Sequence, residues 1–151
     1  MLTFGIEEEY FITDLHSRQM VGEPSAAVLA ACREAIGAGF SFEMFQGQIE
    51  AASPVFTSSA EAADYFRAVR GNLAQSLAEF GLGVVCAGSH PLADWRGQRP
   101  TDQAHFRQLF DDIQYVARRS VLCGLHVHVQ VPQTLDRIAV MNQVSPWLPL
   151  L

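Results

Sequence analysis

Two histidines, His126 and His128, occupy alternate positions of residues 121–131, the most regularly alternating stretch of the chain. The odd positions of this stretch carry only Val, Leu and Cys, and the even positions from Gly124 to Gln130 include the two histidines. A β-strand directs successive side chains to opposite faces, so the imidazoles would share one face, ~7 Å apart, with a core wall on the other. Because imidazole is a common metal ligand, this face is a candidate metal site.

Two carboxylates, Glu7 and Glu9, repeat this spacing in residues 3–12. Carboxylates ~7 Å apart on one strand face repel each other when both are ionised, and a divalent cation relieves that repulsion. An exposed strand with solvated acids is the alternative. Glu8 points to the apolar side, where it needs an arginine partner or an edge position, so we assign it no catalytic role.

Three further residues are weaker candidates. Glu50 lies on the polar face of a third alternating stretch, residues 46–53. Glu43 precedes Glu50 by seven positions and would face the other way in an unbroken strand, so both can reach one site only if the chain turns or bulges between them. His90, in the turn at residues 88–91, either faces a ligand at a strand end or has no role beyond the turn.

The types of these side chains indicate the kind of cation. Imidazole ligands suit Zn²⁺, whereas a set dominated by carboxylate oxygens suits Mg²⁺ or Mn²⁺. If several of the glutamates join the histidines, the count favours Mg²⁺ or Mn²⁺.

The composition excludes several classes of function. The net charge of −6 argues against nucleic acid or an anionic membrane as a partner. All ten basic residues are Arg, so a P-loop lysine and Schiff-base chemistry are excluded. Three widely spaced cysteines, no signal peptide and no apolar run of ~20 residues predict a cytoplasmic protein with reduced, buried thiols.

A single domain over residues 1–151 is expected, because 49% hydrophobic residues can build one core. Strands and helices alternate along it. A helix begins after Ser25 and ends at Gly37, a second begins with the capping-box pattern at residues 58–61, and Thr101 caps a third. Expected strands are 3–12, 46–53, 83–88 and 121–131, and a last helix runs from about 134 to Pro146.

The fold class follows from the faces of the strands. Alternation of strands and helices normally suggests parallel βαβ units, but parallel strands are usually apolar on both faces. The clearest strands here have one apolar and one polar face. We therefore predict an α+β fold, a mostly antiparallel sheet with helices packed on one face and an open polar face.

Four strings, in this order and spacing, resemble the carboxylate–amine ligase family related to glutamate–cysteine ligase, whose fold is akin to that of glutamine synthetase. The strings are Gly5-Ile6-Glu7-Glu8-Glu9-Tyr10, Gln48-Ile49-Glu50, Gly88-Ser89-His90-Pro91 and Cys123-Gly124-Leu125-His126-Val127-His128-Val129. Members of that family are much longer than 151 residues. The apolar end of the chain, residues 145–151, agrees with a front part of a longer catalytic domain.

The resemblance implies an ATP-dependent ligase that forms an amide through an acyl phosphate, with small-molecule amino acid and amine substrates, glutamate and cysteine by analogy. It implies ATP and Mg²⁺ (or Mn²⁺) as cofactors, and leaves homo-oligomerisation and turnover by this chain alone open. The implied metal ligands are Glu7, Glu9, Glu43, Glu50 and His126, the implied catalytic residues are Glu50 and His126, and the implied nucleotide contacts are His90 and His128.

Two other functions stay open at this point. One is a zinc-dependent hydrolase that uses His126 and His128 with an acid. The other is a non-catalytic, truncated domain that binds metal or a partner through its exposed sheet. Retained Zn²⁺ would favour the hydrolase, and loosely held Mg²⁺ or Mn²⁺ the ligase.

Overall fold

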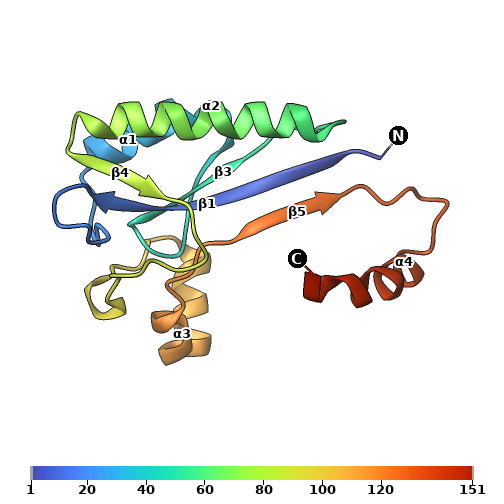
Figure 1. Cartoon of the computed structure of the whole chain (residues 1–151). Helices are drawn as coiled ribbons and strands as arrows, with labels where there is room; N and C mark the ends of the chain where they lie inside the picture. The colour runs from blue at the N-terminus through green and yellow to red at the C-terminus, as the bar shows by residue number, and fades with distance from the viewer. Residues whose placement is uncertain (1, 151) are drawn as a thin grey trace.

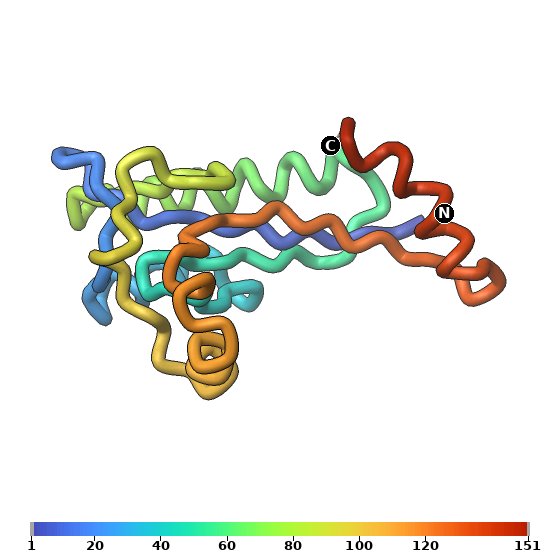
Figure 2. The backbone as a smooth tube through the Cα atoms, turned by 90° about the horizontal axis from the view of Figure 1, so that it is seen from below, coloured from blue at the N-terminus to red at the C-terminus, as the bar shows by residue number. Residues whose placement is uncertain are grey.

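Strand β1 (Phe4–Asp14) is the centre of the fold, because three of the other four strands pair directly with it. The computed structural model describes residues 2–150. One edge of β1 pairs with β3 (Gln48–Ala52), and β3 pairs with β2 (Phe40–Phe42). The other edge is shared by β5 (Leu125–Val129) and β4 (Leu82–Val85). Every pairing is antiparallel, and Figure 2 shows β5 running beside β1.

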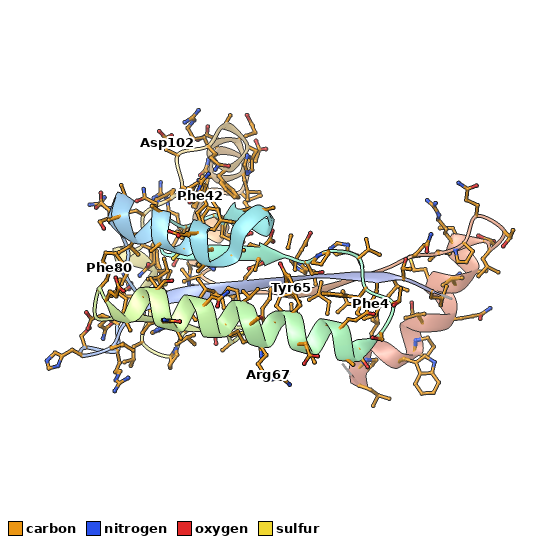
Figure 3. All side chains as sticks on the ribbon, turned by 90° about the horizontal axis from the view of Figure 1, so that it is seen from above. Phe4, Phe42, Tyr65, Arg67, Phe80 and Asp102 are labelled. Atoms are coloured by element: carbon orange, nitrogen blue, oxygen red, sulfur yellow. The ribbon has the colours of Figure 1, made fainter. Side chains whose placement is uncertain are left out.

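Two helices, α1 (Ala26–Ile36) and α2 (Ser59–Ala78), cover one face of the sheet (Figure 1). They lie side by side in Figure 3 and bury the main hydrophobic core against β1 and β3. The predicted ends of α1 are confirmed: Ser25 Oγ accepts the Val28 N–H at 3.3 Å, and α1 ends at Gly37, whose φ of 77° suits glycine. The predicted α+β class with a mostly antiparallel sheet is also confirmed.

The opposite face is polar near the middle of β1 but is not open throughout. A second, smaller core of Phe11, Phe45 and Cys123 lies there, with Phe110 of α3 (Ala104–Arg119) packed against it. Beyond this contact α3 extends away from the sheet, on the side opposite to α1 and α2 (Figure 1). Short 3₁₀ turns complete the fold, at Gly37–Gly39, Trp95–Gly97 and Ser145–Leu150.

Two predictions about α3 are wrong. Its N-cap is Gln103, not Thr101, which is buried two residues before it. The spacing of the apolar residues predicts an inward stripe of Phe106, Leu109, Phe110, Ile113 and Val116. This stripe is mostly exposed, at 44% for Ile113 and 62% for Val116, because α3 projects from the sheet rather than lying on it. Apolar periodicity shows which face of a helix is hydrophobic, but not whether another surface packs against that face.

The histidine strand is shorter than predicted, and its apolar side is not a core wall. Leu125, Val127 and Val129 are more than half exposed, and they are not part of the core that α1 and α2 bury. The last helix, α4 (Arg137–Val144), is capped by Asp136 and lies beyond the end of β5 (Figure 1). None of the described helices is long and apolar enough to span a membrane. The described cysteines are free thiols, and one of them, Cys86, is exposed rather than buried.

Candidate metal centre

The register of β1 and β5 brings both histidines to Glu7. Glu7 is the direct partner of His126, and His128 is the partner of Gly5. The Glu7 Oε2 atom lies 3.3 Å from His126 Nδ1 and 3.0 Å from His128 Nε2. The hydrogen bond with His128 is the main reason that the pKa of Glu7 lies below its ordinary value of 4.5, and the contact with His126 lowers it as well. The imidazoles of β5 and the acids of β1 therefore lie on one face of the sheet.

Glu9 lies deeper on the same face and is held by the chain that leads into β5. Its side chain is almost fully buried, and its Oε2 accepts a hydrogen bond of 2.9 Å from the Gly124 N–H. A Cβ atom at Gly124 would lie 2.8 Å from His126 Nε2 and 3.1 Å from Glu9 Oε1. Glycine therefore lets the backbone approach both side chains here, and a larger residue would require at least one of them to shift.

Glu50 faces Glu9 directly across the β1–β3 pair. Its Oε1 accepts a hydrogen bond of 2.7 Å from Ser41 Oγ on β2. Ser41 was not predicted, although the alternation of Phe40, Ser41 and Phe42 was the signal that could have identified this edge strand.

Glu43 joins the same face because the chain turns between β2 and β3. The condition set by the sequence, a turn between Glu43 and Glu50, is met at residues 43–47. Burial first, and then the negative charge of Glu9, raise the pKa of Glu43 to about 7. This carboxylate is therefore costly to ionise as long as no cation is near.

The side chains form two overlapping groups whose ligand atoms lie within 4.8 Å of one another. Glu7, Glu50 and His126 make the first, Glu9, Glu43 and Glu50 make the second, and Glu50 belongs to both. Ligands that each lie ~2–2.5 Å from an ion are separated by at most about 5 Å, so each group can surround one cation. Four carboxylates and one imidazole are a hard, oxygen-dominated set, which fits Mg²⁺ or Mn²⁺ better than Zn²⁺.

His90 is not brought into these groups. Its Nδ1 accepts the Leu92 N–H at 3.2 Å, and its Nε2 lies 3.1 Å from Thr13 Oγ1. The ring is buried and stands edge-on to Phe11, with 5.6 Å between centroids. Both nitrogens are thus already engaged within the fold, and its contact with a nucleotide stays a prediction.

Glu8 lies on the helix side of the sheet with the arginine partner that its position required. Arg70 of α2 donates to both carboxylate oxygens, through Nε at 3.0 Å and through Nη2. Tyr10 Oη and Cys86 Sγ also donate to Glu8. Burial alone would raise the pKa of Glu8, but these bonds outweigh burial and hold the pKa below 4.5. Glu8 is therefore a buried anchor between β1 and α2.

Comparison with known proteins agrees with the resemblance in the sequence. The family model for glutamate–cysteine ligase family 2 matches residues 3–151. A Pseudomonas fluorescens protein named “Putative glutamate–cysteine ligase 2” is 67% identical over 147 residues, which are 97% of this chain and 38% of that protein. A protein of the same name from Pseudomonas putida is 54% identical over 99% of this chain and 40% of its own length. The chain thus spans about two fifths of these relatives.

Two solved structures share the fold. A bifunctional glutathione synthetase from Pasteurella multocida matches 88% of this chain and 18% of its own, with a TM-score of 0.68 and 16% identity. A glutamate–cysteine ligase from Francisella tularensis, in complex with AMP, matches 97% of this chain and 30% of its own, with a TM-score of 0.62 and 10% identity. With the family match over nearly the whole sequence, the chain belongs to glutamate–cysteine ligase family 2.

Proposed function

We propose that this chain carries a two-cation centre of an ATP-dependent carboxylate–amine ligase. The observation that supports this most directly is the position of Glu50, shared by two carboxylate-rich groups on one sheet face. Glu7, Glu50 and His126 would hold one Mg²⁺ or Mn²⁺ ion, and Glu9, Glu43 and Glu50 the other. Bound there, the cations would neutralise the triphosphate of ATP.

The proposed reaction forms an amide in two steps. The carboxylate of the acid attacks the γ-phosphorus of ATP, which gives an acyl phosphate and ADP. The amine then attacks the acyl carbon, phosphate leaves, and the amine loses a proton. This chemistry requires positioning and charge neutralisation more than a protein nucleophile, which agrees with a chain that has no lysine.

The surrounding residues hold the proposed ligands in place. The Gly124 N–H orients Glu9, and Ser41 Oγ orients Glu50. His126 and His128 lie at the solvent-exposed end of the centre, beside Glu7, where a triphosphate has room to approach. We therefore assign His126 a ligand role and His128 a contact with the nucleotide phosphates.

The substrates are proposed from the relatives. The names of the Pseudomonas proteins point to glutamate and cysteine, and the Francisella tularensis ligase was solved with AMP. A zinc hydrolase agrees less well with the centre, because only one imidazole stands among the grouped ligands and four of the five are carboxylates.

The test uses a chimera in which this chain replaces the matching segment of the Pseudomonas fluorescens relative. We expect ADP release that requires both L-glutamate and L-cysteine. Glu50→Gln should lower kcat by at least ~10²-fold, because the amide keeps the shape but loses the charge that holds both cations. The matched control is Glu61→Gln at the start of α2, whose carboxylate accepts hydrogen bonds from the N–H and Oγ1 of Thr57.

The outcomes separate the parts of the proposal. Near wild-type turnover in Glu50→Gln would remove Glu50 from the site. Mn²⁺ binding without ADP release on these two substrates would contradict the substrates but not the cation centre. Failure of the wild-type chain to bind Mn²⁺ would contradict the centre itself.

A further inference from the structure

A hollow of about 590 Å³ adjoins the carboxylate groups at the β2 edge of the sheet. Its lining comes from three elements: Arg33 near the end of α1, residues 40–43 of β2 and the turn after it, and Gln103 and His105 at the start of α3. In Figure 3, Phe42 lies beside α1, on the side of the molecule where Asp102 precedes α3. The hollow is large enough for an amino acid, and it lies next to the proposed cation centre.

Arg33 is held in this hollow by aromatic rings rather than by an acid. Its guanidinium carbon lies 5.0 Å from the ring centroid of Phe40 and 5.5 Å from that of Phe42. Within residues 2–150, no carboxylate oxygen lies within 4.0 Å of its nitrogens, whereas Arg70 is paired with Glu8. Ring contacts restrain a guanidinium while its N–H donors stay available, which is the arrangement that binds a carboxylate in two hydrogen bonds.

Two other lining residues, Glu43 and Ser41, connect the hollow to the proposed cations. Glu43 lines the hollow and also belongs to the group with Glu9 and Glu50. Ser41 lines the hollow as well and donates to Glu50. The hollow therefore offers the Arg33 guanidinium to an α-carboxylate, and Glu43 and Ser41 connect it to the proposed cation centre.

We propose that this hollow binds an amino-acid substrate of the ligase, with the substrate's α-carboxylate held by Arg33. This rests on the proposed function, because the bound molecule matters only if chemistry takes place at the adjoining centre. A phosphate group fits less well, since a single arginine would have to neutralise it. Phe42 and Phe106 provide apolar surface for the substrate's carbon chain.

The test measures binding to the 151-residue chain by NMR, with L-glutamate and L-cysteine as probes and Mn²⁺ binding measured separately. Each probe is compared with its α-amide, isoglutamine or cysteinamide, which lacks the free α-carboxylate. We expect at least one of the two acids to shift the signals of Arg33 and residues 41–43, and its α-amide to bind at least ~10-fold more weakly. Arg33→Gln should abolish that preference, and Arg33→Lys should keep part of it.

Arg67→Gln is the matched control, since Arg67 is an exposed arginine on α2. Equal binding of an acid and its α-amide, unchanged binding by Arg33→Gln, or no binding of either acid would overturn the proposal. Mn²⁺ binding tests the cation centre independently: loss of amino-acid binding in Arg33→Gln with Mn²⁺ binding retained supports the substrate site alone.

Discussion

Glu9 and Glu50 are direct partners on neighbouring antiparallel strands, so their carboxylates face each other across β1 and β3. Ser41 Oγ donates a hydrogen bond to Glu50, and the Gly124 N–H donates one to Glu9. These bonds orient both acids toward the same space, where Glu43 adds a third carboxylate. Such concentration of negative charge is unfavourable without a counter-ion, and this is the physical basis of the predictions on cation binding.

The stoichiometry of cation binding should depend on which acid is removed. Glu50 belongs to both ligand groups, so Glu50→Gln should weaken binding of two Mn²⁺ ions. Glu43 belongs to one group, so Glu43→Gln should leave one Mn²⁺ site intact. Isothermal titration with Mn²⁺ alone distinguishes these cases. A single weakened site in Glu50→Gln would contradict the shared-ligand arrangement.

The free energy of unfolding of the metal-free chain should depend on pH because of Glu43. Its pKa is raised to about 7 in the folded state, from an ordinary value of 4.5, so between these pH values the folded chain binds more protons than the unfolded chain. Stability contributed by Glu43 is therefore present below about pH 4.5 and is lost as the pH rises through about 7, by up to about 3 kcal/mol.

The measurement is urea unfolding of the wild type and Glu43→Gln between pH 4.5 and 8. The free energy of unfolding of the variant should exceed that of the wild type increasingly as the pH rises. Saturating Mg²⁺ should close this gap, because it binds the ionised acid of the wild type. A difference that does not depend on pH would show that Glu43 is not costly to ionise.

Gly124→Ala should disturb the centre without unfolding the chain. The added Cβ would meet His126 Nε2 and Glu9 Oε1 at 2.8 and 3.1 Å, so at least one of these side chains must move. We expect Mn²⁺ affinity to fall by ~10-fold or more, a loss in scale with a displaced or reoriented ligand. Gly71→Ala in α2 is the control, because within residues 2–150 the added Cβ meets no atom beyond its own stretch of helix within 4 Å, and alanine favours a helix.

Arg70→Met should destabilise the fold by about 2–3 kcal/mol at pH 7, since it leaves the buried Glu8 carboxylate without its cation. This estimate is below that for a fully buried pair because the Arg70 side chain is 53% exposed. Arg67→Met, which removes an exposed pair with Asp64, should have almost no effect.

The contribution of Glu8 to stability should change with pH in the opposite direction to that of Glu43. The pKa of Glu8 lies below 4.5 in the folded chain, so its contribution to stability is present above pH 4.5 and is lost as the pH falls through the lowered value. Urea unfolding of both arginine variants from pH 7 down to pH 3 checks this. A penalty for Arg70→Met that is unchanged at pH 3 would contradict the charge-based account.

The faces of the strands were determined by the sequence alone. Side chains on a strand alternate with a period of two, so Glu7 and Glu9 had to share a face, as did His126 and His128, and Glu8 had to point the other way. The start of α1 at Ser25 was equally local, because a cap depends on a few adjacent residues. These features follow from the chain's own geometry and require no knowledge of its neighbours.

The tertiary structure decided which strands are neighbours and in what register. The pairing of Glu9 with Glu50 and of Glu7 with His126 joins residues far apart in the chain, and a shift of one position would have turned either partner to the other face. The hairpin that returns Glu43 to the site, the burial of His90 and the projection of α3 away from the sheet depend likewise on long-range packing. No local pattern encodes such contacts, because the free energy that selects them comes from surfaces buried between distant segments.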